Sequence, residues 1–314
     1  MVKDQYKQHP NAKEKKDDSN APFYQSSWKE VGHPSDKQSD LKFARPSKLN
    51  FSMSLLKSPR RKWGYHVATP DELELLNRKS SELRNVARFY KEKLANGKIY
   101  YVYKDGESIK TLKTRFGKEN FAHLVGISFD RRNAQQILDD ISDGKFSQNA
   151  ILVKNDYSTF EKLEVVDRLA NVISSKNSVL SNLSQNSKQA QKLNLNAAIK
   201  SFDNSYLLAY RYFNPDVMGP VSLINLSNTR KGYSDYSNVP GKEVLAVLSE
   251  NPNKMGGYSI GTSSINYDYL HDSKQLVEIV SAMQKLVMQD YMRQKSNNKF
   301  SKLSQKKEKH HRER

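Results

Sequence analysis

The sequence predicts an α+β protein in which N-terminal helices pack on an antiparallel sheet, flanked by disordered basic tails. Three observations support this fold class. Apolar residues recur at helical spacing over 69–94, whereas 98–114 and 205–263 hold short β-branched and aromatic runs between turn residues. Helices followed by closely spaced strands favour an α+β layer over a doubly wound parallel sheet. Both chain ends are rich in charged residues and have no sustained hydrophobic period.

The composition indicates one packed domain with unpacked ends. Hydrophobic residues make up 36% of the 314 residues, below the roughly 45–50% apolar content of ordinary globular domains. A substantial part of the chain is therefore expected to stay outside a core. We expect a disordered basic arm over 1–66, an α+β domain over 67–292 and a disordered basic tail over 293–314.

The first predicted helix has clear start and stop signals. Thr69 is a suitable N-cap, a proline follows at the first helical position, and Glu72 completes a capping box. The apolar stripe then continues until Asn96 and Gly97, which predict its end.

Three further helices are predicted along the chain. One is capped by Asp130 and closed by Gly144. Another opens on a second capping box, formed by Ser158 and Glu161, and carries apolar residues through 173. The last covers 273–293.

Strands are predicted wherever β-branched and aromatic runs meet turn signals. Asp105 and Gly106 predict a hairpin between 98–104 and 107–114. The Ser-, Asn- and Gln-rich segment 180–192 is predicted to be a loop. Further strands are predicted over 205–213, 220–226, 243–249 and 258–263.

The charge points to a polyanionic partner. Against 34 Asp and Glu, 52 Lys and Arg give a net charge of +18, which attracts DNA, RNA or anionic membrane through counterion release. Lysine-rich tails that only confer solubility are the alternative. The chain has no cysteine, which excludes disulfides, thiolate nucleophiles and Cys-ligated zinc and fits a cytoplasmic protein. No apolar run approaches membrane-spanning length, so secretion and membrane insertion are not expected. Of these polyanions we expect nucleic acid, and not membrane, as the partner.

The sequence lacks the motifs that mark several enzyme classes. The chain has no P-loop, no dinucleotide-binding glycine motif and no nucleophile elbow. Of seven histidines, only His123 lies well inside the predicted domain, so we expect neither a histidine metal site nor a cofactor. Because His123 stands in the apolar segment 120–127, a hydrogen-bonded structural histidine is the alternative to a catalytic one.

The chain resembles the phage-associated nucleases of the Barnase-EndoU-Colicin-RelE-like superfamily, fourth family. The resemblance lies in the order of three segments and of the strand-rich part after them; the segments are NFAHLVGI, SDGKF and YSTFEKLEVV. The resemblance covers about 85–265. Its most specific element is a Phe-x-His-Leu-x-Gly signature, matched by Phe121, His123, Leu124 and Gly126. Val125 stands where threonine is expected.

The resemblance implies a compact fold of N-terminal helices and an antiparallel sheet that cuts RNA without metal, in proteins carried by phages and conjugative elements. Such cleavage needs a group that takes the 2′-hydroxyl proton, a group that protonates the leaving 5′-oxygen, and cations that stabilise the phosphate. Histidine, lysine, arginine, tyrosine and serine suffice for this chemistry. RNA is therefore the expected partner, with DNA and an immunity or antitoxin protein as further candidates.

We assign His123 as general acid or base, and we expect basic and hydroxyl-bearing side chains to contact the phosphate. The predicted catalytic residues are His123, Lys162, Arg211, Tyr258, Ser259 and Thr262. The predicted nucleic-acid-binding residues are Arg60, Arg61, Lys62, Arg230 and Lys231. Each assignment has an alternative: Lys162 and the nucleic-acid-binding residues could be ordinary surface cations. Arg211 could be an exposed cross-strand charge, and the segment with Tyr258, Ser259 and Thr262 could be a plain hairpin loop.

The function predicted from these residues is a metal-independent endoribonuclease of phage or conjugative-element type, which cleaves RNA by attack of the 2′-hydroxyl. The alternative is a non-enzymatic nucleic-acid-binding accessory protein of a mobile element, in which His123 only supports the core. A degraded nuclease used as a protein-interaction module is the third interpretation. Cleavage of RNA in EDTA that depends on His123 would distinguish the enzyme from a binder.

Overall fold

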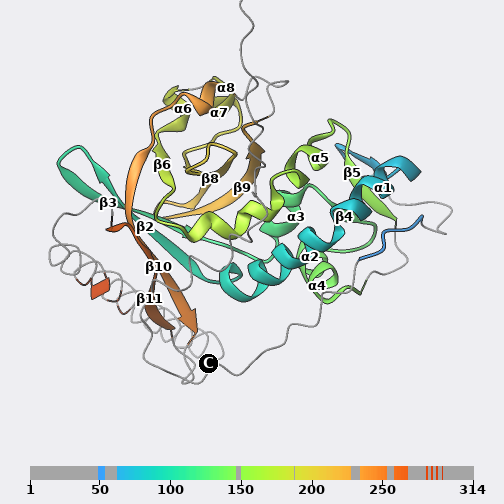
Figure 1. Cartoon of the computed structure of the whole chain (residues 1–314), viewed down its shortest axis with the longest axis horizontal. Coiled ribbons are helices and arrows are strands. Elements are labelled where there is room, and N and C mark those ends of the chain that lie inside the picture. The colour runs from blue at the N-terminus through green and yellow to red at the C-terminus, as the bar shows by residue number, and fades with distance from the viewer. Residues whose placement is uncertain are drawn as a thin grey trace, which may run out of the picture. The chain divides into compact units, whose positions relative to one another are not determined.

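The computed structural model describes residues 49–53, 62–145, 150–186, 188–227, 234–252 and 258–267, with residues 281, 284, 285, 288 and 292. Its main feature is a large sheet that closes on itself, beside which lie a group of helices and a small three-stranded sheet (Figure 1). The structure is therefore mixed α+β, as the sequence predicts.

Seven of the eight strands in the main sheet form a barrel. Their order around the barrel is β10-β2-β3-β9-β8-β7-β6, and the antiparallel pairing of Lys242 with Val179 closes β10 onto β6. The eighth strand, β11, adds to β10 outside the ring. The bounds are β2 (Lys98–Asp105), β3 (Ser108–Arg115), β6 (Ser178–Ser181), β7 (Ala197–Lys200), β8 (Tyr206–Asn214), β9 (Val217–Asn225), β10 (Lys242–Pro252) and β11 (Tyr258–Ile265).

The expected arrangement of helices on an antiparallel sheet is wrong in two respects. One seam of the barrel is parallel, since β3 meets β9 through the pairing of Thr114 with Met218. The helices also lie before and between the barrel strands. The parallel seam joins residues that are far apart in the sequence, a pairing that local periodicity does not encode.

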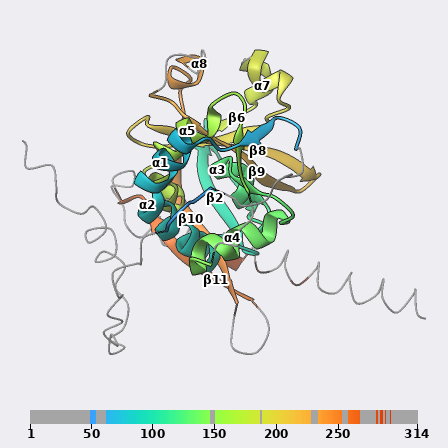
Figure 2. The same ribbon diagram turned by 90° about the vertical axis from the view of Figure 1, so that its right-hand side faces the viewer.

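The helices and the small sheet gather mainly on one side of the barrel, while α6, α7 and α8 cover another part of its outer face (Figure 2). The small sheet has the order β1-β5-β4 and is antiparallel. The bounds are β1 (Tyr65–Val67), α1 (Pro70–Arg78), α2 (Ser80–Phe89), the π-helical turn η1 (Tyr90–Leu94), α3 (Asn120–Val125), β4 (Ser128–Phe129), α4 (Ala134–Asp143), β5 (Ile151–Lys154), α5 (Ser158–Leu163), the 3-10 helix η2 (Val166–Ile173), α6 (Leu183–Asn186), α7 (Lys188–Lys192) and α8 (Ser234–Ser237).

One hydrophobic core joins the barrel interior to the helices. A series of aromatic rings makes this connection visible: Tyr90 packs on Phe121 of α3, with ring centroids 5.3 Å apart, and on Phe116, at 5.9 Å. Phe116 in turn meets the ring of Tyr210 on β8 edge-on at 6.2 Å. Edge-to-face packing of buried rings stabilises beyond the area that it buries. Helix α3 is thereby held against the barrel.

The signals of the first predicted helix are confirmed, but the helix is divided. The Glu72 backbone N–H donates to Thr69 Oγ1 at 3.3 Å, and the Thr69 N–H donates to Glu72 Oε2 at 2.9 Å. At Lys79 the backbone leaves helical geometry, and α2 starts at Ser80, whose hydroxyl donates to the Asn77 carbonyl at 2.7 Å. A serine that bonds its own backbone competes with a continuous helix.

The predicted Asp130 cap is wrong, while the predicted end of that helix is confirmed. The N-cap of α4 is Asn133, which forms a capping box with Gln136, and Asp130 is buried instead. Gly144 ends α4 with a φ of 72°, a left-handed conformation that glycine adopts at little cost.

The predicted capping box of Ser158 and Glu161 is also wrong. Tyr157 stands at the N-cap of α5, without a side-chain bond to the helix. The helix ends at Leu163, and the apolar residues after it continue in the 3-10 helix η2. The hydroxyl in this region that serves a structural role belongs to Thr159, as shown below.

The later strand predictions are confirmed, and the loop prediction over 180–192 is wrong. The expected strands correspond to β8, β9, β10 and β11, and the expected hairpin to β2 and β3. The segment after 177 forms β6, α6 and α7, and the short strands β1, β4, β5 and β7 were missed. Most of the helix expected over 273–293 lies outside the described residues.

The expected bounds of the arm, the domain and the tail stay a prediction. Residues 1–48 and 293–314 lie outside the described part of the chain. Ahead of β1, Leu49 and Phe51 are buried. The Phe51 N–H donates to Asn77 Oδ1 at 2.6 Å, and Asn77 Nδ2 donates to the Phe51 carbonyl at 2.9 Å. This short segment is thus fastened to α1.

Removal of the Phe116 ring tests the aromatic connection between helices and barrel. We expect Phe116→Ala, at a fully buried site, to lower the free energy of unfolding by about 3–5 kcal/mol. Phe213→Ala is the matched control, because that ring is 54% exposed, and it should cost less than about 1 kcal/mol. Urea unfolding measures both variants. Equal losses of unfolding free energy would show that the series of aromatic rings does not stabilise the contact between the helices and the barrel.

Candidate functional site

Helix α3 presents His123 to solvent and buries the rest of the Phe-x-His-Leu-x-Gly signature. Phe121 and Leu124 are three residues apart, so they share one face of the helix, and both are fully buried in the core. His123 lies on the opposite face and is exposed. The two apolar signature residues therefore fix the helix, and the histidine is free for chemistry.

Gly126 ends α3 and lets α5 approach it closely. Its φ is 72°, and a Cβ at this position would lie 3.1 Å from both Cα and Oγ1 of Thr159. The Thr159 hydroxyl donates to the Gly126 carbonyl at 2.8 Å and accepts from the Lys154 N–H at 2.9 Å. One side chain thus links α3, α5 and β5, and only glycine fits the joint without strain.

Three lysines carry charges that act on the exposed imidazole, and we call Lys62, Lys154 and Lys162 the lysine cluster. Lys162 of α5 donates from Nζ to the His123 carbonyl at 2.8 Å. Lys62, just before β1, donates from Nζ to Ser128 Oγ at 2.9 Å. Lys154 ends β5. Each lysine acts on the charge state of His123.

Tyr65 holds two members of the lysine cluster together. In the small sheet, Tyr65 of β1 pairs directly with Lys154 of β5. Lys154 Nζ lies 4.1 Å from the centroid of the Tyr65 ring, and Lys62 Nζ lies 4.5 Å from it. A ring face attracts a cation, so Tyr65 offsets part of the repulsion between the two ammonium groups.

The lysine cluster favours the neutral form of His123. Protein atoms around the ring withdraw part of its hydration, and this partial desolvation is the largest cause that lowers the His123 pKa below 6.5. The charges of Lys62, Lys154 and Lys162 lower it further, and Glu119 opposes them. Desolvation and the charge of Lys154 also lower the pKa of Lys62. At neutral pH the imidazole can therefore accept a proton, beside cations that attract an anion.

Arg211 is exposed on β8, opposite Gly219 of β9, while its neighbour Tyr210 points into the core. Among the sequence-predicted catalytic residues, the structure brings His123 and Lys162 together through the bond from Lys162 Nζ to the His123 carbonyl. Arg211 is not among the charges that shift the His123 pKa.

The predicted hydroxyl residues lie on β11. Thr262 pairs with Leu248 of β10, and its Oγ1 accepts from Gln284 Nε2 at 2.7 Å. Tyr258 and Ser259 open the same strand, and the description does not extend to their side chains. Both ribbon views show β11 away from α3 (Figures 1 and 2). A phosphate pocket shared with His123 is therefore not formed by Thr262.

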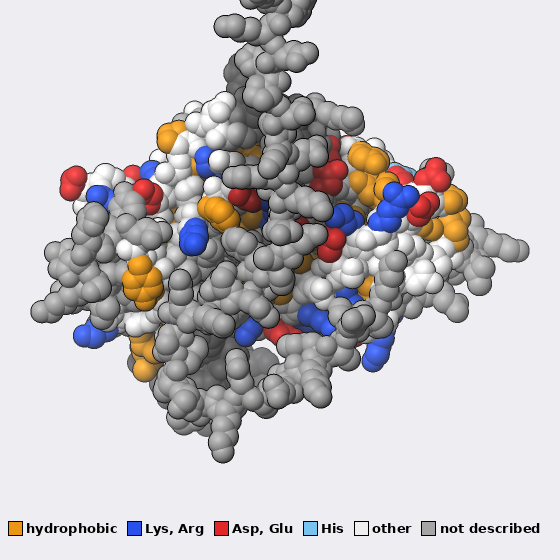
Figure 3. All heavy atoms as spheres, viewed as in Figure 1, with side chains coloured by type: hydrophobic (Ala, Val, Ile, Leu, Met, Phe, Trp, Pro, Cys, Tyr) orange, Lys and Arg blue, Asp and Glu red, His pale blue; other side chains and the backbone are white. Residues whose placement is uncertain are grey.

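Of the predicted nucleic-acid-binding residues, Lys62 belongs to the lysine cluster. Arg60, Arg61, Arg230 and Lys231 lie outside the described residues. On the face that Figure 3 shows, the visible Lys and Arg side chains of the described residues alternate with Asp and Glu and form no continuous basic patch.

Lys154 and Tyr65 are the site residues that the sequence analysis missed. Lys154 ends a four-residue strand, which is too short for a clear period, and Tyr65 falls in a segment that we expected to be disordered. The only local signal was the apolar run before Lys154, with a lysine at its end.

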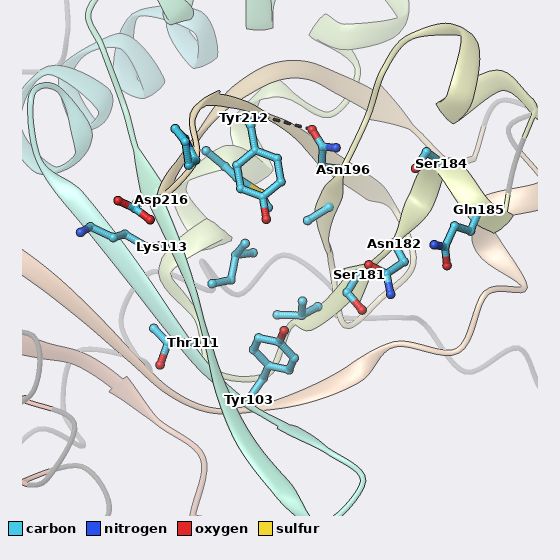
Figure 4. A pocket seen from close by; sticks show the side chains of 15 residues that line it. Tyr103, Thr111, Lys113, Ser181, Asn182, Ser184, Gln185, Asn196, Tyr212 and Asp216 are labelled. Carbon is cyan, nitrogen blue, oxygen red and sulfur yellow. Dashed lines mark hydrogen bonds between the residues drawn. The ribbon is translucent and has the colours of Figure 1, made fainter.

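A hollow lies at one end of the barrel and is lined by none of the predicted catalytic residues. It encloses about 260 Å³, and Figure 4 shows the hydroxyl groups of Tyr103 and Tyr212 directed into it. Burial and Asp105 raise the pKa of Tyr103. The rest of its polar lining includes Thr111, Lys113, Ser181, Asn182, Asn196 and Asp216.

The described residues offer no group of three or more His, Asp or Glu side chains suited to hold a metal ion. Within the same residues, no helix combines the length and the apolar character needed to cross a bilayer.

The chain matches a known protein family over more than half of its length. The family described as phage-Barnase-EndoU-ColicinE5/D-RelE like nuclease4 matches residues 82–266. This range includes α3, α5, β5 and the barrel strands, and it begins after Lys62 and Tyr65. Searches of curated proteins and of solved structures found no match.

The electrostatic origin of the His123 shift can be tested by removing one cation. We expect Lys154→Gln to raise the His123 pKa, because the substitution removes a positive charge that disfavours imidazolium. An NMR titration of the ring protons measures the change. Lys104→Gln, on the exposed part of β2, is the matched control and should leave the titration unaltered. A fall or no change in Lys154→Gln would contradict the assignment.

The joint at Gly126 can be tested against a second left-handed glycine. We expect Gly126→Ala to lower the free energy of unfolding by about 1–2 kcal/mol through the left-handed backbone, and further through the contact with Thr159. Gly106 has a φ of 62°, and a Cβ added there would have no atom within 4 Å. Gly106→Ala should therefore lose only the free energy that the left-handed backbone costs alanine. Thermal or urea unfolding compares them, and equal losses would refute a close fit between α3 and α5.

Proposed function

The chain belongs to the phage-Barnase-EndoU-ColicinE5/D-RelE like nuclease4 family, and from this premise we propose that it is a metal-independent endoribonuclease of phage or conjugative-element type. Membership supports a nuclease activity and agrees with the resemblance carried by the Phe-x-His-Leu-x-Gly signature. The choice of RNA and of a metal-free mechanism is our inference. The observation that supports this inference is that His123 is exposed and that desolvation and the charges of three lysines lower its pKa.

In the proposed reaction, His123 is the general base. Its lowered pKa keeps the imidazole unprotonated at neutral pH, so it can take the proton of a ribose 2′-hydroxyl. The 2′-oxygen attacks the adjacent phosphorus, the bond from phosphorus to the 5′-oxygen breaks, and a 2′,3′-cyclic phosphate remains. DNA lacks the attacking hydroxyl, which makes RNA the substrate of this mechanism.

The lysine cluster supplies the electrostatic part of the reaction. Negative charge builds up on the phosphate oxygens in the transition state, and fixed cations stabilise it. The leaving 5′-oxygen takes up a proton, for which Lys62 is our candidate donor, because desolvation and Lys154 lower its pKa. Lys162 is our candidate for phosphate contact, since its bond to the His123 carbonyl keeps its ammonium group next to α3.

Cleavage of labelled RNA in EDTA tests the proposal. We expect the unsubstituted protein to cut RNA, to leave 2′,3′-cyclic phosphate ends and to spare DNA of the same sequence. His123→Gln should reduce the rate by about 10²–10⁴-fold, the usual contribution of a general base. The rate should rise with pH through a pKa below 6.5, since only neutral His123 accepts the proton.

His66→Gln is the matched control for the histidine. The His66 ring is held between Glu72, at 2.9 Å from Nε2, and Asn155, at 3.1 Å from Nδ1, so its loss should leave the cleavage rate within a few fold. Cleavage that needs a divalent metal, or that persists in His123→Gln, would overturn the mechanism. Salt-sensitive RNA binding without cleavage would instead support a nucleic-acid-binding accessory protein.

A further inference from the structure

Two exposed aromatic side chains lie next to the lysine cluster in the sequence. Trp63 follows Lys62 and is 98% exposed, and Tyr157 lies three residues after Lys154 and is 51% exposed. A single exposed aromatic residue needs no explanation. The pair calls for one because both residues belong to turns that also carry a lysine acting on His123.

The two turns are hydrogen-bonded to each other. In the first, the Tyr65 N–H donates to the Lys62 carbonyl at 3.0 Å, and in the second the Tyr157 N–H donates to the Lys154 carbonyl at 3.2 Å. The Asn155 N–H donates to the Gly64 carbonyl at 3.1 Å and so connects them. The pairing of β1 with β5 continues this connection. We call Trp63 and Tyr157 the aromatic rim.

The backbone holds Tyr157 in an unfavourable conformation. Its φ is 65°, a left-handed value that is uncommon for a residue with a large side chain. The ring packs on Phe160, with centroids 4.8 Å apart, and Phe160 is itself buried. The tyrosine ring is therefore supported on one side, while about half of its surface remains open to solvent.

We propose that the aromatic rim stacks on unpaired bases of the RNA substrate, on either side of the phosphate held by the lysine cluster. This inference rests on the proposed function and specifies its substrate class as single-stranded RNA. Lysines that contact phosphates next to aromatic rings that stack on bases form the combination that binds single strands without a strict sequence preference. In a duplex, the base faces are already covered by their neighbours. The rim thus favours single strands and adds nothing for a duplex.

Binding to a cleavage-silenced protein tests the rim. In the full-length His123→Gln background, we would measure the affinity for a fluorescein-labelled RNA 12-mer of mixed sequence and for the same strand in a perfect duplex. Trp63→Ala and Tyr157→Ala should each weaken single-strand binding by about 5–100-fold, since one base stack contributes about 1–3 kcal/mol. Duplex binding should change less than twofold.

Tyr212→Ala is the matched control, because this tyrosine is 49% exposed and lines the barrel-end hollow. Its single-strand affinity should stay within twofold. Equal losses for single strand and duplex, an equal loss in Tyr212→Ala, or unchanged affinity in both rim variants would each overturn the proposal. The dependence of affinity on salt should persist in Trp63→Ala, because the lysines that release counterions are intact.

The proposed function and the rim can fail separately. If the unsubstituted protein does not cut RNA but the rim variants lose single-strand affinity, the ribonuclease is wrong and the rim stands. If the unsubstituted protein cuts RNA in EDTA while Trp63→Ala and Tyr157→Ala keep full affinity, the rim is wrong and the ribonuclease stands.

Discussion

The surroundings of His123 depend on one hydroxyl group, that of Thr159. It donates to the Gly126 carbonyl and accepts from the Lys154 N–H, so the end of α3, the start of α5 and the end of β5 are joined at one atom. Because Gly126 has no Cβ, α5 can come close enough for Lys162 to reach the His123 carbonyl. At the other end of α5, Asn225 of β9 donates to Glu164 at 2.7 Å. The barrel thereby supports the whole arrangement.

This arrangement collects like charges that repel one another. Three ammonium groups around one imidazole lower the affinity of that ring for a proton, and Lys154 lowers the proton affinity of Lys62 as well. The Tyr65 ring between Lys62 and Lys154 offsets part of the repulsion. A bound phosphate would offset more of it. Perturbed pKa values of this kind are frequent at functional sites, although structural ion networks produce them as well.

The sequence analysis succeeded where a local signal determines a local structure. Thr69 and Glu72 cap α1, the Asp105 and Gly106 turn joins β2 to β3, and Gly144 ends α4. It failed where a long-range contact competes with the local signal.

The failures have specific physical causes. The capping box expected at Ser158 does not form, and the neighbouring Thr159 hydroxyl bonds instead to two backbone groups outside its own helix. Lys154 is positioned by the pairing of β1 with β5 and by the bond from its N–H to Thr159, and sequence periodicity revealed neither strand. Closure of the barrel through β10 and β6 depends in the same way on distant pairing. The structure brings Lys162 next to His123, and the elements that carry both residues have local sequence signals, whereas no local signal bears on the position of Arg211. The catalytic roles of all three residues stay predictions.

The net charge of the chain and the lysine cluster act over different distances. At physiological salt the screening length is about 8 Å, so a cation far from His123 changes its protonation little, although it still attracts a polyanion by counterion release. The +18 charge of the chain can therefore attract a polyanion without fixing the position of any one phosphate. Holding a phosphate beside His123 would instead require fixed cations, and Lys62, Lys154 and Lys162 are cations whose charges act on this imidazole. The net charge thus acts through the whole chain, whereas the contacts of Thr159 fix the position of α5 and β5, and with them Lys162 and Lys154, relative to His123.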